Sequence, residues 1–193
     1  LSGLRKTLDK LTEKGKLTAE KSDEVFNNIK PCTDISGLKD SDLVIEAIIE
    51  NRDIKTKVFV ELESFVSQNC IIGSNTSSIS ITSLSSELKN PERFIGIHFF
   101  NPAPLMPLVE VIPGLLTDKN LPQEIYDLMK SWGKTPVTCS ATPGFIVNRV
   151  ARPFYGEGQR MVADGTIDPA TLDYALTREG FRLGPMALTD LIG

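Results

Sequence analysis

Apolar residues recur at two spacings along the chain, and these spacings predict two kinds of element. Short, nearly continuous apolar runs predict strands at 42–49, 70–74, 94–100, 108–113 and 135–140. Spacings of three and four residues predict helices at 2–14, 18–29, 55–66, 79–88 and 121–132. Because strands and helices alternate up to residue 140, we predict an α/β fold with a mostly parallel sheet.

Beyond residue 140 the spacing is helical only. It predicts one long helix at 145–165, which continues past Pro153, and further helices at 168–180 and from 184 onward. Asp168 is a good N-cap residue, and Pro169 suits the first helical position. We therefore predict an α/β domain in 1–140 and the start of an all-helical domain in 141–193.

Composition excludes some classes of protein. The 193 residues are 40% hydrophobic and 24% charged, with a net charge of −4, which disfavours binding to a phosphate backbone. No apolar stretch reaches the roughly 18 residues of a membrane span. The opening LSGLRKTLDKLTEKGK predicts an amphipathic helix rather than a signal peptide. We expect no partner among nucleic acids or membranes.

Three cysteines, Cys32, Cys70 and Cys139, are far apart in the sequence. Their odd number and the lack of C-x-x-C spacing argue against a disulfide framework and against a zinc site. We expect reduced thiols, no bound metal and a cytoplasmic location.

Glycine-rich phosphate-binding motifs do not occur in this sequence. It contains neither G-x-G-x-x-G nor G-x-x-x-x-G-K-S/T. The one G-x-G, at 156–158, lies within a helical pattern and lacks the third glycine. Nucleotide binding has no support from this motif alone.

The segment GSNTSS, at 73–78, follows an apolar strand with a row of polar side chains. In open α/β folds, ligands bind outside the carboxyl ends of parallel strands, where this segment is predicted to lie. Asn75, Thr76 and Ser77 could equally well cap the next helix. The local pattern leaves both interpretations open.

His98 is the only histidine, and it ends an apolar strand. Histidine is the side chain best suited to move protons near neutral pH, and Glu110, in the next strand, could fix its tautomer. Alternatively, His98 is a hydrogen-bonded core residue and Glu110 faces solvent. A hydrolase built from Ser77 or Ser78 with His98 and Glu110 is a further alternative, although G-x-S-x-G is absent.

Several segments together resemble the L-3-hydroxyacyl-CoA dehydrogenase family, in the style of bacterial 3-hydroxyacyl-CoA or 3-hydroxybutyryl-CoA dehydrogenases. They are DLVIEAIIEN, SNTSS, RFIGIHFFNPAPLMPLVEVI, TPGFIVNRVARPFYGE and GFRLGPMALTDLIG. The resemblance implies a Rossmann-like NAD-binding domain followed by a helical domain that forms a homodimer. It also implies an acyl-CoA thioester substrate, bound between the domains, and a role in β-oxidation of fatty or aromatic acids.

The same resemblance assigns roles to individual residues. His98 resembles the catalytic acid/base and Glu110 its orienting partner, while Ser77 and Asn148 resemble the groups that hold the substrate oxygen. The residues that resemble NAD contacts are Ala47, Glu50, Lys55, Asn75, Ser77 and Asn101.

Three departures from the family pattern define the alternatives. The opening βαβ unit with its glycine-rich turn is not in the sequence, the helical domain stops early, and Ala141 replaces a polar residue before TPGF. A non-catalytic truncated remnant of such an enzyme is therefore one alternative. A dehydrogenase-like protein with a structural role is another.

Overall fold

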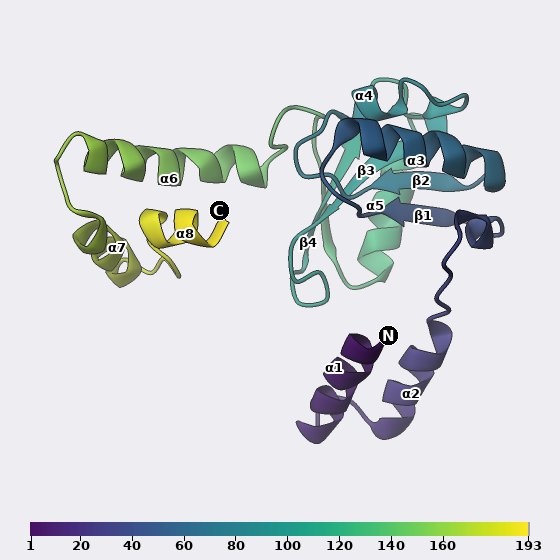
Figure 1. Cartoon of the computed structure of the whole chain (residues 1–193), viewed down its shortest axis with the longest axis horizontal. Coiled ribbons are helices and arrows are strands. Elements are labelled where there is room, and N and C mark those ends of the chain that lie inside the picture. Colours follow the sequence, from purple (N-terminus) through teal and green to yellow (C-terminus); the bar gives the residue numbers. More distant parts are fainter. Residues whose placement is uncertain (193) are drawn as a thin grey trace. The chain divides into compact units, whose positions relative to one another are not determined.

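The computed structural model describes residues 1–192, in two compact units that divide between Asp40 and Ser41. The first unit contains α1 (Ser2–Glu13), α2 (Ala19–Asn28) and the 3-10 helix η1 (Ile35–Leu38). The second contains, in chain order, β1 (Leu43–Glu46), α3 (Arg52–Phe65), β2 (Ile71–Ser74), α4 (Ile81–Ser85), η2 (Pro91–Arg93), β3 (Phe94–Phe99), β4 (Leu108–Pro113), α5 (Leu121–Ser131), β5 (Thr135–Thr138), α6 (Val147–Ala163), α7 (Pro169–Arg178) and α8 (Pro185–Ile192). Figure 1 labels the main elements.

The first unit is a helical hairpin. Its turn passes through Gly15, whose φ of +65° lies in the left-handed region that favours glycine. Between the helices, Arg5 forms an ion pair with Asp23 at 2.7 Å and lies 4.0 Å from the centre of the Phe26 ring. The two predicted helices of this region are confirmed.

The second unit is built on a five-stranded sheet in the order β1-β2-β3-β4-β5. The neighbouring strands are parallel except for β3 and β4, which are antiparallel. The predicted mostly parallel sheet is thus confirmed. In the β3–β4 register His98 lies directly opposite Glu110.

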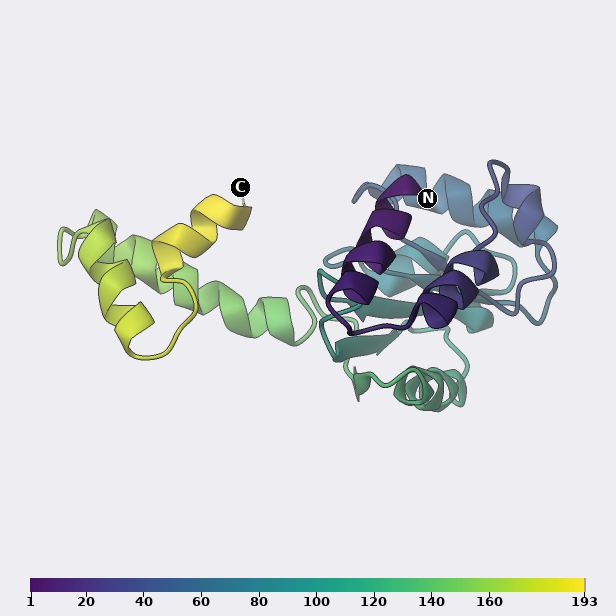
Figure 2. The same ribbon diagram turned by 90° about the horizontal axis from the view of Figure 1, so that it is seen from below.

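Helices cover both faces of this sheet, with α3 on one face and α5 on the other (Figure 2). Side chains alternate between the faces along a strand, so Ile95 and Ile97 of β3 pack with Ile125 and Met129 of α5. His98, in the opposite phase of the alternation, must point to the other face. The hydrophobic pattern of β3 therefore decides the side on which the histidine lies.

Helices α7 and α8 pack against one another, and α8 packs against α6. Gly158 permits the approach to α8, because a Cβ atom there would lie 2.6 Å from Pro185 Cγ. Helix α6 continues past Pro153, as the sequence pattern predicts. No helix within residues 1–192 has the length and apolar character needed to cross a bilayer.

The first strand is shorter than its apolar run predicts. It ends at Glu46 instead of residue 49, where the Glu46 carboxylate accepts a hydrogen bond from the Ile48 N–H at 2.6 Å. The predicted end of this strand at residue 49 is therefore wrong. Ala47 and Glu50 lie in the loop that leads to α3.

Candidate active site

A cavity of about 590 Å³ adjoins the ends of β2 and β3 and the faces of α6 and α8. Four of the residues predicted for catalysis or substrate binding lie near it, and three of them line it: Ser77, His98 and Asn148. The complete lining is Asn75, Ser77, His98, Phe99, Phe100, Asn101, Asn148, Ala151, Arg152, Tyr155, Leu188 and Ile192. Segments far apart in the sequence thus meet at one site.

His98 and Glu110 form a buried pair. The Nδ1 atom of His98 lies 2.7 Å from Glu110 Oε2, and the two side chains are 7% and 0% exposed. The interpretation that Glu110 faces solvent is therefore wrong, because both residues lie on the same side of the sheet as a cross-strand pair. A carboxylate at Nδ1 places the ring proton there, which leaves Nε2 able to accept a proton at the cavity.

The second oxygen of Glu110 is held by the start of α6. Its Oε1 accepts the Ile146 and Val147 N–H groups, each at 2.9 Å. The positive end of the helix dipole and two donors compensate for the burial of this carboxylate. Glu110 therefore couples the sheet to the helix that carries Asn148.

A tight turn brings the start of α6 over Glu110. Gly144 has a φ of +78°, and a Cβ atom there would lie 3.0 Å from the backbone nitrogen of Arg149. Phe145 also has a positive φ, 47°, which is a strained conformation for a residue with a side chain. Its ring lies 5.7 Å from the ring of His98 and is buried beside it.

Glu50 organises the loop that carries Ser77. Its Oε1 accepts from the Thr76 hydroxyl at 2.6 Å and from the N–H groups of Ser77 and Ser78 at 3.0 and 3.1 Å. Partial burial raises the pKa of Glu50, but hydrogen bonds from Thr76, Ser78 and Ser77 and the charge of Lys55 outweigh it, so the pKa lies below its ordinary value. The loop thus depends on an ionised Glu50.

Lys55 is fully buried in the same network. Its ammonium donates to Glu46 Oε1 at 2.6 Å and to the Ile48 carbonyl at 3.2 Å, and it lies 3.4 Å from Glu50 Oε2. Ser74 donates to the other oxygen of Glu46 at 2.8 Å. With 1% of its side chain exposed, Lys55 can influence a ligand only through these carboxylates.

The remaining predicted site residues lie at different positions around the ends of β2 and β3. Asn75 uses its Oδ1 to accept the Phe99 N–H at 2.7 Å, which ties the ends of β2 and β3 together. Asn148 donates from Nδ2 to the Ser77 carbonyl at 3.4 Å. Asn101 and Ala47 are exposed, and only Asn101 lines the cavity.

The serine hydroxyls show no nucleophile geometry. Ser78 Oγ donates to Glu50 at 3.1 Å, and within residues 1–192 neither Ser77 nor Ser78 is hydrogen-bonded to His98. A serine hydrolase requires that bond between nucleophile and base. The arrangement gives no support to this alternative.

The cysteines and possible metal ligands add no further chemistry at the site. All three cysteines are free. Burial, with a smaller contribution from the charge of Glu110, raises the pKa of the Cys139 thiol to about 11, which keeps it protonated and unreactive. Across residues 1–192, no cluster of three or more His, Cys, Asp or Glu side chains could hold a metal ion.

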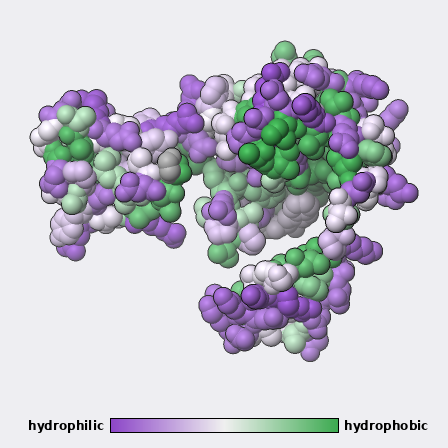
Figure 3. All heavy atoms as spheres, in the orientation of Figure 1, coloured by the Kyte–Doolittle hydropathy of each residue, from purple (hydrophilic) through white to green (hydrophobic). Residues whose placement is uncertain are grey.

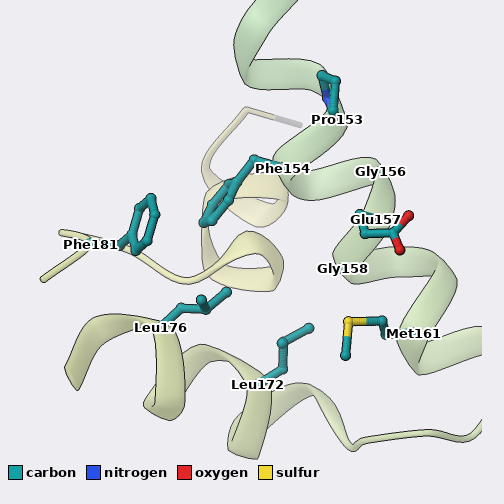
Figure 4. Close-up of a pocket in the computed structure, with 9 residues that line it drawn as sticks. All are labelled: Pro153, Phe154, Gly156, Glu157, Gly158, Met161, Leu172, Leu176 and Phe181. Atoms are coloured by element: carbon teal, nitrogen blue, oxygen red, sulfur yellow. The ribbon is translucent and has the colours of Figure 1, made fainter. Parts of the chain in front are cut away.

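A second cavity, of about 710 Å³, lies between α6 and α7 (Figure 4). Its lining is apolar except for Glu157, which pairs with Arg160 on the same helix. Phe154 and Phe181 stack in it with ring centres 4.8 Å apart. Its one titratable lining group is Glu157, which is 58% exposed and paired with Arg160, whereas His98 is buried and oriented by Glu110, so we place the candidate chemistry at His98.

Comparison with known protein families matches the chain to two family models. The family model described as 3-hydroxyacyl-CoA dehydrogenase, NAD binding domain, matches residues 1–142, and the one described as 3-hydroxyacyl-CoA dehydrogenase, C-terminal domain, matches residues 144–193. The fold is thus that of a Rossmann-type NAD-binding domain followed by a helical C-terminal domain. The chain belongs to the 3-hydroxyacyl-CoA dehydrogenase family.

Two curated relatives illustrate the relationship. The 3-hydroxyadipyl-CoA dehydrogenase of Escherichia coli K12 is 46% identical over the whole chain, which spans 41% of that protein. The 3-hydroxybutyryl-CoA dehydrogenase of Clostridioides difficile is 42% identical over the whole chain, which spans 69% of it. The chain therefore corresponds to two fifths of the first protein and about two thirds of the second.

Solved structures show the same fold. The crystal structure of 3-hydroxybutyryl-CoA dehydrogenase from Escherichia coli K12 matches the whole chain with a TM-score of 0.96 and 47% identity, over 41% of its own length. That of (S)-3-hydroxybutyryl-CoA dehydrogenase from Ralstonia eutropha matches 97% of the chain with a TM-score of 0.93 and 41% identity, over 67% of its own length.

Sequence reasoning missed several residues of the site. Glu46 interrupts an apolar run, and a buried carboxylate requires a partner, so this signal could have identified its ion pair. Arg152 and Tyr155 follow Asn148 at spacings of four and seven residues, which places all three on one helix face. Phe145 gives no sequence signal, because its strain comes from the fold.

Proposed function

We propose that the complete protein carrying this chain oxidises L-3-hydroxyacyl-CoA thioesters to 3-oxoacyl-CoA with NAD⁺, and catalyses the reverse reduction. The observation that carries the proposal is the buried pair of His98 and Glu110 beside a cavity lined also by Ser77 and Asn148. Family membership adds support, and the relatives named above carry this class of activity in their names.

In this mechanism the chain's own residues move one proton. His98 Nε2 takes the proton of the substrate's 3-hydroxyl group and returns it in the reverse direction. Glu110 keeps Nδ1 protonated and stabilises the imidazolium that forms, since its carboxylate lies 2.7 Å from that atom. Ser77 and Asn148 hold the substrate oxygen in place. NAD⁺, when bound, accepts the hydride that leaves carbon 3.

The chemistry of the loops fits the reacting end of the dinucleotide. Glu50 has 37% of its side chain exposed and can accept hydrogen bonds from ribose hydroxyls, while Asn75 and Asn101 add polar groups beside the cavity. Apolar surface lies over the region of α3 (Figure 3). In the loop before α3, Ile48 and Ile49 are 42% and 66% exposed, and Ile54, in the first turn of α3, is 43% exposed. Ala47 and Ser77 complete the proposed contacts, and Lys55 acts through Glu50.

Partners and location extend the same proposal. Because the family models divide between residues 142 and 144, we propose an NAD-binding domain up to about residue 140 and a helical domain from 141, which forms a homodimer in the complete protein. The free cysteines fit a reducing compartment, so we propose the cytoplasm. No nucleic acid has a role in this proposal, in keeping with the net charge of −4.

A hydride-transfer assay tests the proposal. The complete protein is mixed with acetoacetyl-CoA and NADH, and the loss of NADH absorbance is followed. We expect turnover that depends on both compounds and saturates with each. Hydrolysis of the thioester without NADH consumption would instead support the serine hydrolase, and absence of both reactions would support a non-catalytic protein.

A further inference from the structure

Arg152 introduces a charge into the candidate active site that the proposed reaction does not use. It lies on α6, one helical turn beyond Asn148, and lines the same cavity as His98 and Ser77. It is the only permanently charged side chain among the residues that line the cavity, which include no Asp or Glu. Proton transfer and hydride transfer at carbon 3 need no cation at this position.

Among the residues that the structure describes, Arg152 has no acidic partner. Arg5, Arg93 and Arg160 form ion pairs with acidic side chains, whereas several exposed arginines do not; among these, Arg152 is the one that lines the cavity. Within residues 1–192 no carboxylate oxygen lies within 4.0 Å of the Arg152 guanidinium. A guanidinium at a cavity wall is the preferred partner of a planar anion, which it binds through two parallel hydrogen bonds.

The distance along α6 between Asn148 and Arg152 limits the length of a ligand that could contact both residues. Four residues of an α-helix rise about 6 Å, so the Cα atoms of Asn148 and Arg152 are separated by about that distance along the helix axis. The arginine side chain can shorten or extend this reach. In a six-carbon acyl chain, carbon 6 lies three carbon–carbon bonds from carbon 3, roughly 4 Å when extended. A carboxylate at carbon 6 can therefore approach the guanidinium while carbon 3 lies at His98.

We propose that Arg152 binds a carboxylate at the far end of the acyl chain, so that the site prefers 3-hydroxyacyl-CoA thioesters of dicarboxylic acids. This inference rests on the proposed function, because it assumes that carbon 3 reacts at His98. Leu188 and Ile192 provide apolar contacts for the methylene groups of the chain. The specificity comes from a charge pair that a methyl-terminated chain of equal length cannot form.

Two substrates that differ only at the chain end test this directly. They are 3-hydroxyadipyl-CoA, with a terminal carboxylate, and 3-hydroxyhexanoyl-CoA, with a terminal methyl group. We expect the complete parent protein to oxidise the first with at least a tenfold higher kcat/KM. In Arg152→Gln, kcat/KM for 3-hydroxyadipyl-CoA should fall about ten- to hundredfold, and that for 3-hydroxyhexanoyl-CoA should change less than about twofold.

Two further variants control the experiment. Arg152→Lys should restore part of the preference, since it keeps the charge and loses the paired hydrogen bonds. Arg149→Gln is the matched control, because Arg149 is exposed on the same helix and does not line the cavity. Its effect on the ratio of the two kcat/KM values should be small.

The outcomes separate this inference from the proposed function. A parent protein that oxidises 3-hydroxyhexanoyl-CoA at least as well as 3-hydroxyadipyl-CoA contradicts the carboxylate site alone. Equal losses for both substrates in Arg152→Gln also contradict it, and would assign Arg152 to a phosphate of CoA or of the dinucleotide, which both reactions share. A parent that oxidises neither thioester overturns the proposed function and this inference together.

Discussion

The Nδ1 atom of His98 and the Oε2 atom of Glu110 lie 2.7 Å apart, directly opposite each other on antiparallel strands β3 and β4. The other oxygen of Glu110 accepts two N–H groups at the start of α6. One carboxylate therefore orients the histidine and fixes the helix that carries Asn148. The orientation of His98 and the position of Asn148 therefore both depend on Glu110.

Replacement of His98 tests the proton-transfer role. His98→Gln keeps a polar side chain of similar size but removes the group that can take a proton. We expect kcat to fall about a hundred- to ten-thousandfold, the usual contribution of general acid–base catalysis. Steady-state kinetics with acetoacetyl-CoA and NADH measure it. A variant with near-parent kcat would show that another group is the base.

Replacement of Glu110 separates orientation from anchoring. Glu110→Gln keeps an oxygen that can accept the Ile146 and Val147 N–H groups but removes the negative charge, so we expect kcat to fall at least about a hundredfold with the fold preserved. Glu110→Ala should in addition leave those two donors without a partner and cost about 2–4 kcal/mol of stability. Urea unfolding, run beside the kinetics, distinguishes the two effects. Equal stabilities of the Gln and Ala variants would contradict the anchoring role.

The buried pair of Lys55 and Glu46 should stabilise the loop between β1 and α3. Lys55→Met leaves Glu46 buried without its cation, and we expect it to lower the free energy of unfolding by about 3–5 kcal/mol. The double variant with Glu46→Leu should cost less than the sum of the single changes, because it removes both buried charges. Urea unfolding of the four proteins gives the coupling energy.

Lys57→Met supplies the matched control for that cycle. Lys57 lies on the same helix but is exposed, so we expect a change within about 0.5 kcal/mol. A similar loss in Lys57→Met and Lys55→Met would mean that the pair with Glu46 contributes nothing specific.

Much of this fold could be predicted from apolar spacing, and the catalytic pair could be proposed as well. The run 94–100 has strand character, and β3 indeed occupies Phe94–Phe99. The helix continues through Pro153 because its apolar face persists on both sides. Local patterns succeed here since each element buries the face that its sequence makes apolar.

The rest depends on contacts between distant segments. The donors to Glu110 lie 36 and 37 residues away in the sequence, and Ser74 donates to Glu46 across 28 residues. The apolar run around Glu46 continues to residue 49, so the local pattern does not predict that the strand ends at Glu46. The direction in which Arg152 faces is likewise set by how α6 packs.

The network around Glu50 should make stability depend on pH. The pKa of Glu50 lies below its ordinary value of 4.5, because the donors of the Ser77 loop and Lys55 outweigh the effect of burial. A carboxyl group with a lowered folded-state pKa contributes stability that is fully present above its unfolded pKa and is lost as the pH falls through the folded value. As the pH falls below 4.5, the free energy of unfolding of the parent should therefore decrease more steeply than that of Glu50→Gln. Urea unfolding at a series of pH values measures both slopes.

The control for this prediction is Glu61→Gln, at an exposed position of α3, the helix that follows Glu50. It should retain the steep pH dependence of the parent, because Glu50 still accepts hydrogen bonds from Thr76, Ser77 and Ser78. If Glu50→Gln and the parent lose stability equally as the pH falls, then the ionised form of Glu50 does not hold this loop. The Ser77 loop would in that case depend on its other anchor, the Asn75 side chain that accepts the Phe99 N–H.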